Sequence, residues 1–431
     1  MIYDATHETM TREDRSQIQM ERLQSTLTRV YRNVAFYRAA FDRWGIDIDS
    51  IRSVKDIRRI PFTTKEDLRK SYPYDMFAVP LRDIVRIHST VGRTGLPIAI
   101  GYTRNDIENW SKQVARVLAA TGVTENDFVQ IAFDYHMFTG AFGLHYGAER
   151  IGASVIPSSQ SGNMQRQVRI MKDYKSTVLL SPPSYALRLA ATLRGMGVHP
   201  EELNLRIGIF GAEPWGEATR GRIEEALHIK AYNIYGINEM MGPGVAGECA
   251  ERNGLHVSED HYIVEIVDPA GGEPLPHGAR GELVITTITR EGFPLIRYRT
   301  GDISSIIEGD CPCGRTTIRM ERVSGRIDDL IVVNGISLFP AQIGDILKRT
   351  TNGEPRFHII IDNHDGEDTI EVQVAVTDRM FDDEIKKLLE LKGQIAGGIE
   401  REIGIQAGVT FIEQSTLQLP EGQGWLVTDR R

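Results

Sequence analysis

The stretch RIGIFGAEPWGEATRGRIEEALHIKAYNIYGINE, residues 206–239, decides the fold class. It begins with a short apolar run, RIGIFG, continues with the helical segment GEATRGRIEEAL, and ends with a second apolar run, AYNIYG. Short apolar and β-branched runs predict buried strands, and a helical segment between two of them predicts a crossover connection. The stretch therefore predicts a strand, helix, strand unit of a layered α/β sheet.

The same alternation continues towards the N-terminus. Further strand-like runs are FVQIAF (128–133), ASVIP (153–157) and STVLLS (176–181), and NMQRQVRIMKDY (163–174) reads as a helix. We expect one layered sheet from about residue 80 to 240, with the chemistry in loops at the strand ends. A separate N-terminal helix is predicted by apolar residues at helical spacing, namely Met20, Leu23, Leu27, Val30 and Val34.

Beyond residue 255 the pattern changes to strands joined by Gly/Pro turns. YIVEIVDPAGGEPLPHGARGELVITT (262–287) predicts a β-hairpin unit. After VSGRIDDLIVVNGISLFP (323–340) the predicted order is helix (341–349), strand (355–362), strand (369–376), long helix (about 381–402) and strand (408–414). This order predicts a small α+β domain of residues 327–431 behind a large domain of residues 1–326.

Composition excludes several classes of protein. The 431 residues carry a net charge of -9, which argues against nucleic-acid binding, because phosphate contacts need a basic face. No apolar run predicts a membrane span or a secretory signal. Three cysteines, two of them one residue apart, do not resemble a disulfide framework. We therefore expect a cytoplasmic protein.

Six blocks of sequence together resemble a known family. They are RIHSTVGRTGLPIAIGYTRNDI (86–107), FTGAFGLHYGAERIGASVIP (138–157), FGAEPW (210–215), YGINEMMGPG (235–244), LIRYRTGD (295–302) and SGRIDDLIVVNGISLFP (324–340). In this order they resemble the phenylacetate-CoA ligases, a branch of the acyl-adenylate-forming (ANL) superfamily. The resemblance implies a large α/β N-terminal domain with a β-rich section and a small, mobile α+β C-terminal domain. It also implies an aromatic acid, ATP and CoA as substrates.

The resemblance assigns roles to individual positions. The acyl pocket is implied at Tyr135, Phe138, Phe142, Gly211, Ala212, Glu213, Pro214 and Gly236. Aromatic rings in such a pocket suit a planar acyl group. Nucleotide contacts are implied at Tyr235 (adenine), Asp302 (ribose) and Arg326, magnesium at Glu239, and the hinge at Asp328. A carboxylate suits the ribose because it can accept two hydrogen bonds.

The loop HSTVGRTGLP (88–97) is a candidate phosphate site. Small residues let backbone N–H groups surround a phosphate, and the hydroxyls add donors. We single out Thr90, Gly92 and Thr94. Most loops of this composition are only turns, so this assignment depends on the neighbouring blocks.

Cys249, His256, Cys311 and Cys313 form a candidate zinc site. The CPCG turn aims two thiols at one point, and GECAERNGLH supplies one more thiol and an imidazole. Four protein ligands leave no open position, which predicts a structural zinc. The resemblance supports zinc at these positions. The alternative is a set of buried or idle thiols.

Two departures from the family concern ATP. Leu96 stands where the family loop has a lysine, and Arg93 replaces a hydroxyl residue. In the tail EGQGWLVTDRR (421–431), Gln423 stands at the lysine that bridges carboxylate and α-phosphate, with Trp425 and Leu426 at two further basic positions. Losing one preorganised charge of this kind costs on the order of 10² to 10³ in rate.

From these losses we predict an ATP-independent acyltransferase. It would move a benzoyl-, phenylacetyl- or anthraniloyl-type group from an aryl-CoA to the phosphopantetheine of an acyl carrier protein. The family resemblance implies a homodimer. One alternative is an ATP-dependent aryl-CoA ligase in which Arg93 or another cation compensates. Another is a catalytically silent binding protein. No catalytic base is assigned, because a core or surface role is the more common one for histidines placed like His136 and His145.

Overall fold

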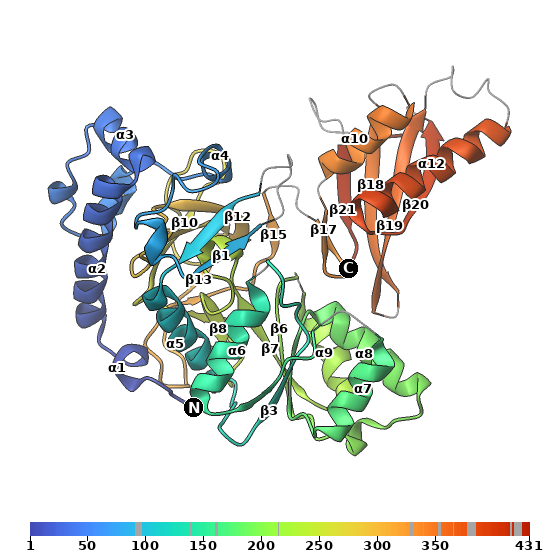
Figure 1. Cartoon of the computed structure of the whole chain (residues 1–431), viewed down its shortest axis with the longest axis horizontal. Helices are drawn as coiled ribbons and strands as arrows, with labels where there is room; N and C mark the ends of the chain where they lie inside the picture. The colour runs from blue at the N-terminus through green and yellow to red at the C-terminus, as the bar shows by residue number, and fades with distance from the viewer. Residues whose placement is uncertain are drawn as a thin grey trace. The chain divides into compact units, whose positions relative to one another are not determined.

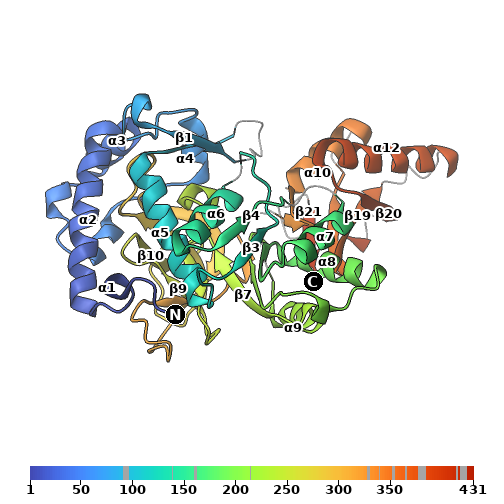
Figure 2. The same cartoon turned by 60° about the horizontal axis from the view of Figure 1, so that its bottom comes forward.

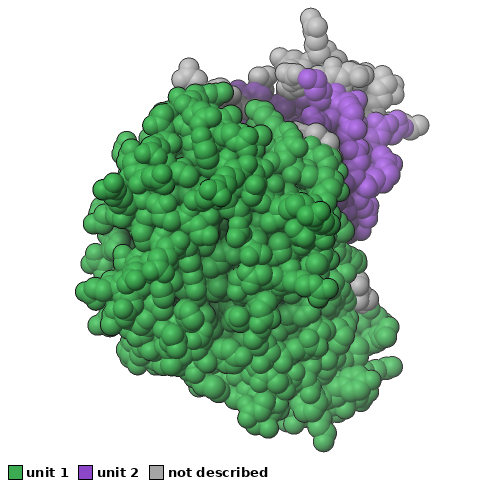
Figure 3. Space-filling model, turned by 60° about the vertical axis from the view of Figure 1, so that its left-hand side comes forward, with its two compact units in different colours: residues 1–183, 196–327 green, residues 184–195, 328–431 purple. Residues whose placement is uncertain are grey.

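A computed structural model gives the fold. It describes residues 1–90, 97–137, 139–159, 163–213, 215–327, 331–338, 340–351, 355–364, 366–376, 385–413, 416–417 and 425–431. No helix in these ranges is long and apolar enough to cross a membrane. The chain splits into two compact units, one of residues 1–183 and 196–327 and the other of residues 184–195 and 328–431 (Figure 3). The predicted domain limits, 1–326 and 327–431, stay a prediction.

A mixed sheet forms the centre of the large unit. Its strands are β3 (Phe128–Ile131), β4 (Ser154–Ile156), β5 (Val178–Ser181), β6 (Ile207–Phe210), β7 (Lys230–Tyr235), β8 (Ala246–Glu248), β9 (Leu255–Val257), β13 (Ile306–Ile307) and β14 (Arg319–Met320). In the described part of the chain the order is β13-β14-β9-β8-β7-β6-β5-β3-β4. The strands from β7 to β4 pair in parallel, as the alternating sequence predicts.

Helices cover both sides of the parallel strands. The α-helices of the described residues are α1 (Ala5–Glu8), α2 (Arg12–Asn33), α3 (Ala35–Trp44), α4 (Lys65–Lys70), α5 (Arg104–Ala120), α6 (Gly140–Ile151), α7 (Met164–Asp173), α8 (Pro183–Gly195), α9 (Glu217–Leu227), α10 (Pro340–Thr351) and α12 (Ile385–Ile403). α5 and α6 lie on one side of β3 to β7, and α7 and α9 on the other (Figures 1 and 2). A capping box of Thr103 and Asp106 starts α5.

A second sheet of the large unit is antiparallel. It is built from β10 (Tyr262–Val267), β11 (Gly281–Thr287), β12 (Tyr298–Ser304) and β15 (Gly325–Arg326) in that order. β10 and β11 form the predicted hairpin unit. β12 pairs with β15, and this register places Asp302 opposite Arg326. A two-stranded ribbon, β1 (Arg86–Ser89) with β2 (Ala99–Tyr102), leads into and out of the predicted phosphate loop.

The small unit carries its own sheet. Its strands are β18 (Phe357–His364), β19 (Glu367–Val376), β20 (Ala407–Glu413) and β21 (Trp425–Asp429), and β16 (Ile331–Val333) pairs with β17 (Ile336–Leu338) beside them. The predicted helices and strands of this region are confirmed as α10, β18, β19, α12 and β20. β21 was not predicted. It pairs in parallel with β18, with Trp425 opposite Phe357, so a strand 68 residues earlier in the chain determines its conformation.

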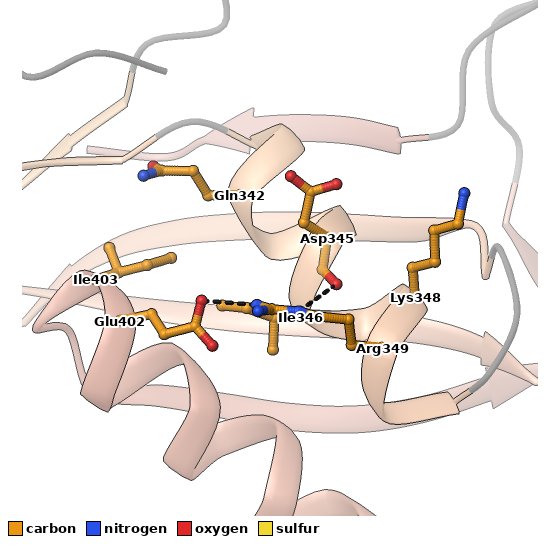
Figure 4. Close-up of a pocket in the computed structure, with 7 residues that line it drawn as sticks. All are labelled: Gln342, Asp345, Ile346, Lys348, Arg349, Glu402 and Ile403. Carbon is orange, nitrogen blue, oxygen red and sulfur yellow. Dashed lines mark hydrogen bonds and ion pairs between the residues drawn. The ribbon is translucent and has the colours of Figure 1, made fainter. Parts of the chain in front are cut away.

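A surface hollow of about 400 Å³ lies between α10 and the end of α12 (Figure 4). Its lining residues are Gln342, Asp345, Ile346, Lys348, Arg349, Glu402 and Ile403. At its centre the Arg349 guanidinium donates to the Glu402 carboxylate over 2.6 Å and to the Asp345 carbonyl over 3.2 Å. Since these charges satisfy each other, the hollow indicates no particular ligand.

Candidate active site and metal centre

Two parallel strands bring the first site segments together. β6 and β7 are neighbours, so the residues that follow them meet at the carboxyl edge of the sheet. Gly211 lies so close to β7 that an added Cβ would be 2.5 Å from the Ile234 carbonyl oxygen. Ala212 has a φ of +68°, a conformation that costs an L-residue roughly 1 kcal/mol or more and is found most often at functional sites. The structure thus places a strained, tightly packed turn where the acyl pocket is predicted.

The loop after β7 is held by side chains from other elements. At Gly236 an added Cβ would be 1.8 Å from the Gly242 carbonyl oxygen, so only glycine fits there. The Thr139 hydroxyl donates to the Asn238 side chain over 2.5 Å, the Tyr262 hydroxyl to the Met240 carbonyl over 2.9 Å, and the Trp110 indole to the Pro243 carbonyl over 2.8 Å. These hydrogen bonds fix the backbone on both sides of Glu239.

Asp302 is the centre of a polar network at the sheet edge. It is 2% exposed, and its carboxylate accepts from the Tyr235 hydroxyl over 2.6 Å and from Arg326 Nη1 over 2.7 Å. Burial, together with the Asp302 charge, raises the pKa of Tyr235 well above its usual value, so Tyr235 stays a donor at neutral pH. The three predicted nucleotide residues Tyr235, Asp302 and Arg326 are therefore adjacent. A carboxylate has about four acceptor positions, which leaves room for ribose hydroxyls.

Glu239, the predicted magnesium ligand, is 6% exposed and lies in the 3₁₀ turn η5 (Asn238–Met240). The Tyr298 hydroxyl lies 3.4 Å from its Oε1. Magnesium in nucleotide sites is typically held by one or two carboxylates together with substrate phosphates. A single buried carboxylate at the strand edge fits that donor set.

Aromatic side chains gather around Phe142 on α6. Tyr135 meets Phe142 edge to face at 5.3 Å, and Tyr146 stacks on it at 6.4 Å. The Arg86 guanidinium lies 4.9 Å from the Phe142 ring centre. The Tyr135 hydroxyl is 3.1 Å from His145 Nδ1, and burial raises the Tyr135 pKa. The predicted acyl-pocket residues Tyr135 and Phe142 thus belong to one aromatic cluster.

Several predicted positions lie outside the described residues. These are Gly92, Arg93, Thr94, Leu96, Phe138, Pro214, Asp328 and Gln423. Thr90 is described: its N–H donates to the Ile98 carbonyl over 3.1 Å and its hydroxyl accepts from the Ile98 N–H over 3.3 Å, so it joins the two ends of the loop. Glu213 is half-buried directly after Ala212. His136 is exposed, and His145 pairs with Glu149 over 3.1 Å.

The four predicted metal ligands converge. The ligand atoms of Cys249, His256, Cys311 and Cys313 all lie within 4.8 Å of one another. The Cys249 and Cys311 sulfurs are 3.7 Å apart, and Cys313 Sγ is 3.4 Å from His256 Nε2. Tetrahedral zinc with bonds of about 2.3 Å separates two sulfurs by roughly 3.8 Å, so the spacing fits. This buried Cys3His cluster is suited to bind zinc.

Neighbouring residues orient the cluster. The Thr317 hydroxyl lies 2.9 Å from His256 Nδ1, which leaves Nε2 for the metal, as the second shell of such sites commonly does. Burial lowers the pKa of His256 to about 4, so the imidazole is neutral, as ligation requires. Burial also raises the pKa of the Cys249 thiol to about 12 in the absence of a metal. The sequence had no signal for Thr317, because its role depends on the pairing of β9 with β14.

The structure therefore unites predicted residues that are far apart in the chain. Tyr235, Asp302 and Arg326 form one network, Tyr135 and Phe142 one cluster, and the cysteines with His256 another. Their roles in binding stay predictions. The residues that support them, such as Thr139, Trp110 and Tyr262, were not predicted, because their role depends on contacts with the loop after β7 that only the fold creates.

Comparison with known proteins tests the resemblance. Residues 61–289 match the AMP-binding enzyme family, and residues 335–431 match the AMP-binding enzyme C-terminal domain. The chain is 40% identical to phenylacetate-coenzyme A ligase of Thermus thermophilus, over 98% of both chains. It is also 40% identical to the phenylacetate-coenzyme A ligase of Escherichia coli, over 98% of this chain and 97% of that one.

A solved structure gives the same result for the fold. The crystal structure of 2-hydroxyisobutyryl-CoA ligase, in complex with 2-HIB-AMP and CoA, has a TM-score of 0.88 and 27% identity, over 99% of this chain and 92% of that one. The predicted fold, with a large α/β N-terminal domain and a small C-terminal domain, is confirmed.

The prediction of an ATP-independent aryl-CoA:carrier-protein acyltransferase is wrong. Relatives that match nearly the whole chain are phenylacetate-coenzyme A ligases, and nothing in the comparisons supports an acyl carrier protein as partner. Leu96 and Gln423 are two differences in a chain that matches these ligases over at least 96% of its length. The alternative reading, an ATP-dependent ligase, agrees better with these relatives.

The network of Tyr235, Asp302 and Arg326, the buried carboxylate of Glu239 and the aromatic cluster lie on a scaffold that is shared with these relatives end to end. The match covers both parts of the fold, because residues 61–289 lie in the large unit except for 184–195, and residues 335–431 lie in the small one. The chain belongs to the phenylacetate-CoA ligase family of AMP-binding enzymes.

Proposed function

We propose that this protein is an ATP-dependent, AMP-forming ligase that converts an aromatic carboxylic acid to its CoA thioester. The observation that carries the proposal is the identity of 39 to 40% to four phenylacetate-coenzyme A ligases over at least 96% of this chain. In the first step the acid's carboxylate attacks the α-phosphorus of ATP and pyrophosphate leaves. In the second step the CoA thiol attacks the acyl carbon and AMP leaves.

The Asp302 network serves the nucleotide in this proposal. The Asp302 carboxylate accepts hydrogen bonds from the ribose hydroxyls, and Arg326 and the Tyr235 hydroxyl hold that carboxylate in place. The Tyr235 ring lies beside the adenine. Bound magnesium at Glu239 would offset phosphate charge as pyrophosphate departs. Because Tyr235 and Arg326 both bind the Asp302 carboxylate, that carboxylate is preorganised for the ribose.

The aromatic cluster serves the acyl group. Phe142 and Tyr135 offer an apolar, ring-shaped surface, which favours a planar aryl group over a flexible chain. The turn at Gly211 and Ala212 brings backbone close to the reacting carboxyl group, and any side chain at residue 211 would be too large. These features support an aromatic acid as substrate class.

The charge that Leu96 and Gln423 do not supply needs another source. Arg93 lies in the same loop as Leu96, three residues before it. We assign to Arg93 the phosphate charge that a lysine provides in the family, although a guanidinium and an ammonium differ in geometry. Adenylation then proceeds with one fewer cation at the α-phosphate.

One experiment tests the proposal. Purified protein is incubated with a panel of aromatic acids including phenylacetate, with ATP, magnesium and CoA, and aryl-CoA and AMP are measured by mass spectrometry. We expect equal amounts of aryl-CoA and AMP, and neither product when ATP is omitted. Aryl-CoA without AMP, or no product from any acid while ATP binds, would overturn the proposal.

We further propose that zinc occupies the Cys3His cluster and stabilises the fold. The sulfur spacing of 3.7 Å and the neutral His256 support this metal. Elemental analysis of protein purified without added metal should give one zinc per chain. Absence of zinc together with fully titratable thiols would contradict the assignment.

A further inference from the structure

Arg290 is a buried cation with an unusual set of contacts. It follows β11 and is 1% exposed. Its Nη1 donates to the backbone carbonyl of Glu239, and its Nε and Nη2 have no hydrogen-bond partner among the described residues. The guanidinium lies 5.0 Å from the Tyr102 ring centre and 5.2 Å from the Phe293 ring centre.

Burying the Arg290 guanidinium in this position destabilises the fold. Removing a guanidinium from water carries a large desolvation penalty, which a carboxylate partner usually offsets. Arg290 has two aromatic faces and one carbonyl instead. Cation–π contacts and a single charge-assisted hydrogen bond offset only part of that penalty. Arg290 therefore destabilises the fold, yet it donates to one particular residue. Its effect on that residue explains its presence.

The residue that Arg290 holds is Glu239, the proposed magnesium ligand. The other residues of its loop are held separately, Met240 by Tyr262 and Pro243 by Trp110. Arg290 thus contacts the backbone of Glu239 from outside the loop. The direction of the Glu239 carboxylate depends on the orientation of the peptide group that Arg290 fixes.

We propose that Arg290 is a positioning residue for the nucleotide-bound cation. By holding the Glu239 carbonyl it orients the Glu239 carboxylate towards the metal, and it touches neither the nucleotide nor the acid. This inference rests on the proposed function, because it assumes that Glu239 binds the magnesium that accompanies ATP. The guanidinium has no role in the chemistry itself.

The test compares Arg290→Met, which removes the donor and the charge, with Arg290→Lys, which keeps both. Binding of Mn²⁺ in place of Mg²⁺, with a non-hydrolysable ATP analogue present, is followed by electron paramagnetic resonance. We expect Arg290→Met to raise the Mn²⁺ dissociation constant roughly tenfold or more, which is the usual loss for a charge-assisted hydrogen bond. Arg290→Lys should lie near the wild type. In turnover, the Mg²⁺ concentration for half-maximal rate should rise in parallel.

Arg15→Met provides the matched control. Arg15 is equally buried at 1% exposure, but it donates to Glu259 and to the Thr316 carbonyl, neither of which belongs to the Glu239 loop. It should lower the melting temperature and leave the Mn²⁺ constant unchanged. Should Arg290→Met fail to fold, Arg290→Gln, which keeps a neutral donor, is measured in its place and should weaken Mn²⁺ binding.

An unchanged Mn²⁺ constant in the folded variant would overturn the inference and leave the ligase proposal intact. Failure of the wild type to bind the Mn²⁺ complex of the analogue would instead count against the proposed function. The two failures are therefore distinguishable.

Discussion

Single residues in this protein act through the contacts that surround them. Asp302 shows this clearly, because its carboxylate accepts hydrogen bonds from both Tyr235 and Arg326. A carboxylate held at 2.6 and 2.7 Å by two donors keeps one orientation. Substitutions at these positions should therefore change nucleotide affinity more than they change the fold.

Tyr235→Phe removes the hydroxyl and keeps the ring. Loss of one hydrogen bond to a charged acceptor should raise the KM for ATP about tenfold, since such a bond contributes about 1.5 kcal/mol or more. The KM for CoA should not change, because the hydroxyl donates to Asp302, the residue proposed to bind the ribose of ATP. Steady-state kinetics with each substrate varied in turn measure both constants. Equal changes in the two KM values would contradict the assigned role.

Gln423 and Leu96 test how much charge adenylation needs. The double variant Gln423→Lys, Leu96→Lys should raise ATP–pyrophosphate exchange by up to roughly 10²-fold, because each lysine restores a preorganised charge at a phosphate. The matched control, Gln423→Met with Leu96→Met, adds length without charge and should have no such effect. If exchange does not rise, another cation already supplies the charge.

Secondary-structure elements of the large unit are tied together by buried polar groups. Burial lowers the pKa of His261, which precedes β10, to about 4 from an ordinary value of 6.5. Its Nδ1 lies 2.7 Å from the Thr289 hydroxyl, beyond β11. In the same unit, Arg315 links the metal cluster to the N-terminal helix α1 by donating to the Glu8 carboxylate over 2.5 Å. We therefore expect the packing of these elements to depend on pH through His261 and on the metal through Arg315.

The His261 shift predicts a pH dependence of stability. The unfolded histidine takes up a proton near pH 6.5 and the folded one only near pH 4, so the unfolded state binds more protons between these values. Its contribution is complete above pH 6.5 and is lost as the pH falls towards 4, by on the order of 2 to 3 kcal/mol. Urea unfolding from pH 7.5 to 4.5 measures this slope. His261→Gln should flatten it, and an equal slope in that variant would exclude His261 as the cause.

Metal removal should loosen the N-terminal segment. Arg315 lies two residues after Cys313, and Glu8 in turn accepts from the Tyr3 and Asp4 N–H groups. If the metal leaves, Arg315 is no longer fixed and the hold on these residues weakens. Amide hydrogen exchange within residues 1–10 should therefore accelerate on chelation, while exchange in β18 and β19 should not. Unchanged exchange in residues 1–10 would separate the metal centre from this segment.

Ligand binding should increase the free energy of unfolding of the whole molecule. Each compact unit has its own apolar core, and the nucleotide contacts proposed above belong to the large one. A ligand that binds only the folded protein stabilises it by about 2.7 kcal/mol at a concentration of 100 times its Kd. AMP at such a concentration should therefore raise the melting temperature by several degrees.

Asp302→Asn is the control for this shift. It keeps the shape of the side chain but removes the charge that holds Arg326, so the response to AMP should largely disappear. Differential scanning fluorimetry with and without AMP gives the comparison. A response equal to the wild type would mean that the nucleotide binds elsewhere.

The class of fold and the family were readable from the sequence because each depends on local patterns. Apolar runs separated by helical segments specify the parallel strands, and the blocks around Tyr235, Asp302 and Arg326 specify the family wherever they lie in space. The metal ligands were likewise visible as residue types. The local patterns did not determine the function. Two altered residues, Leu96 and Gln423, pointed to a transferase, whereas the chain as a whole matches ligases.

Tertiary structure decided which residues support the site. Four residues from separate segments of the chain contact one loop, and their spacing in the sequence does not predict this. They are Thr139, Tyr262, Trp110 and Arg290. Strand β21 is a similar case, since its pairing with β18 sets its conformation. Local sequence reports the preference of the backbone, whereas these features arise from contacts between residues that only folding brings together.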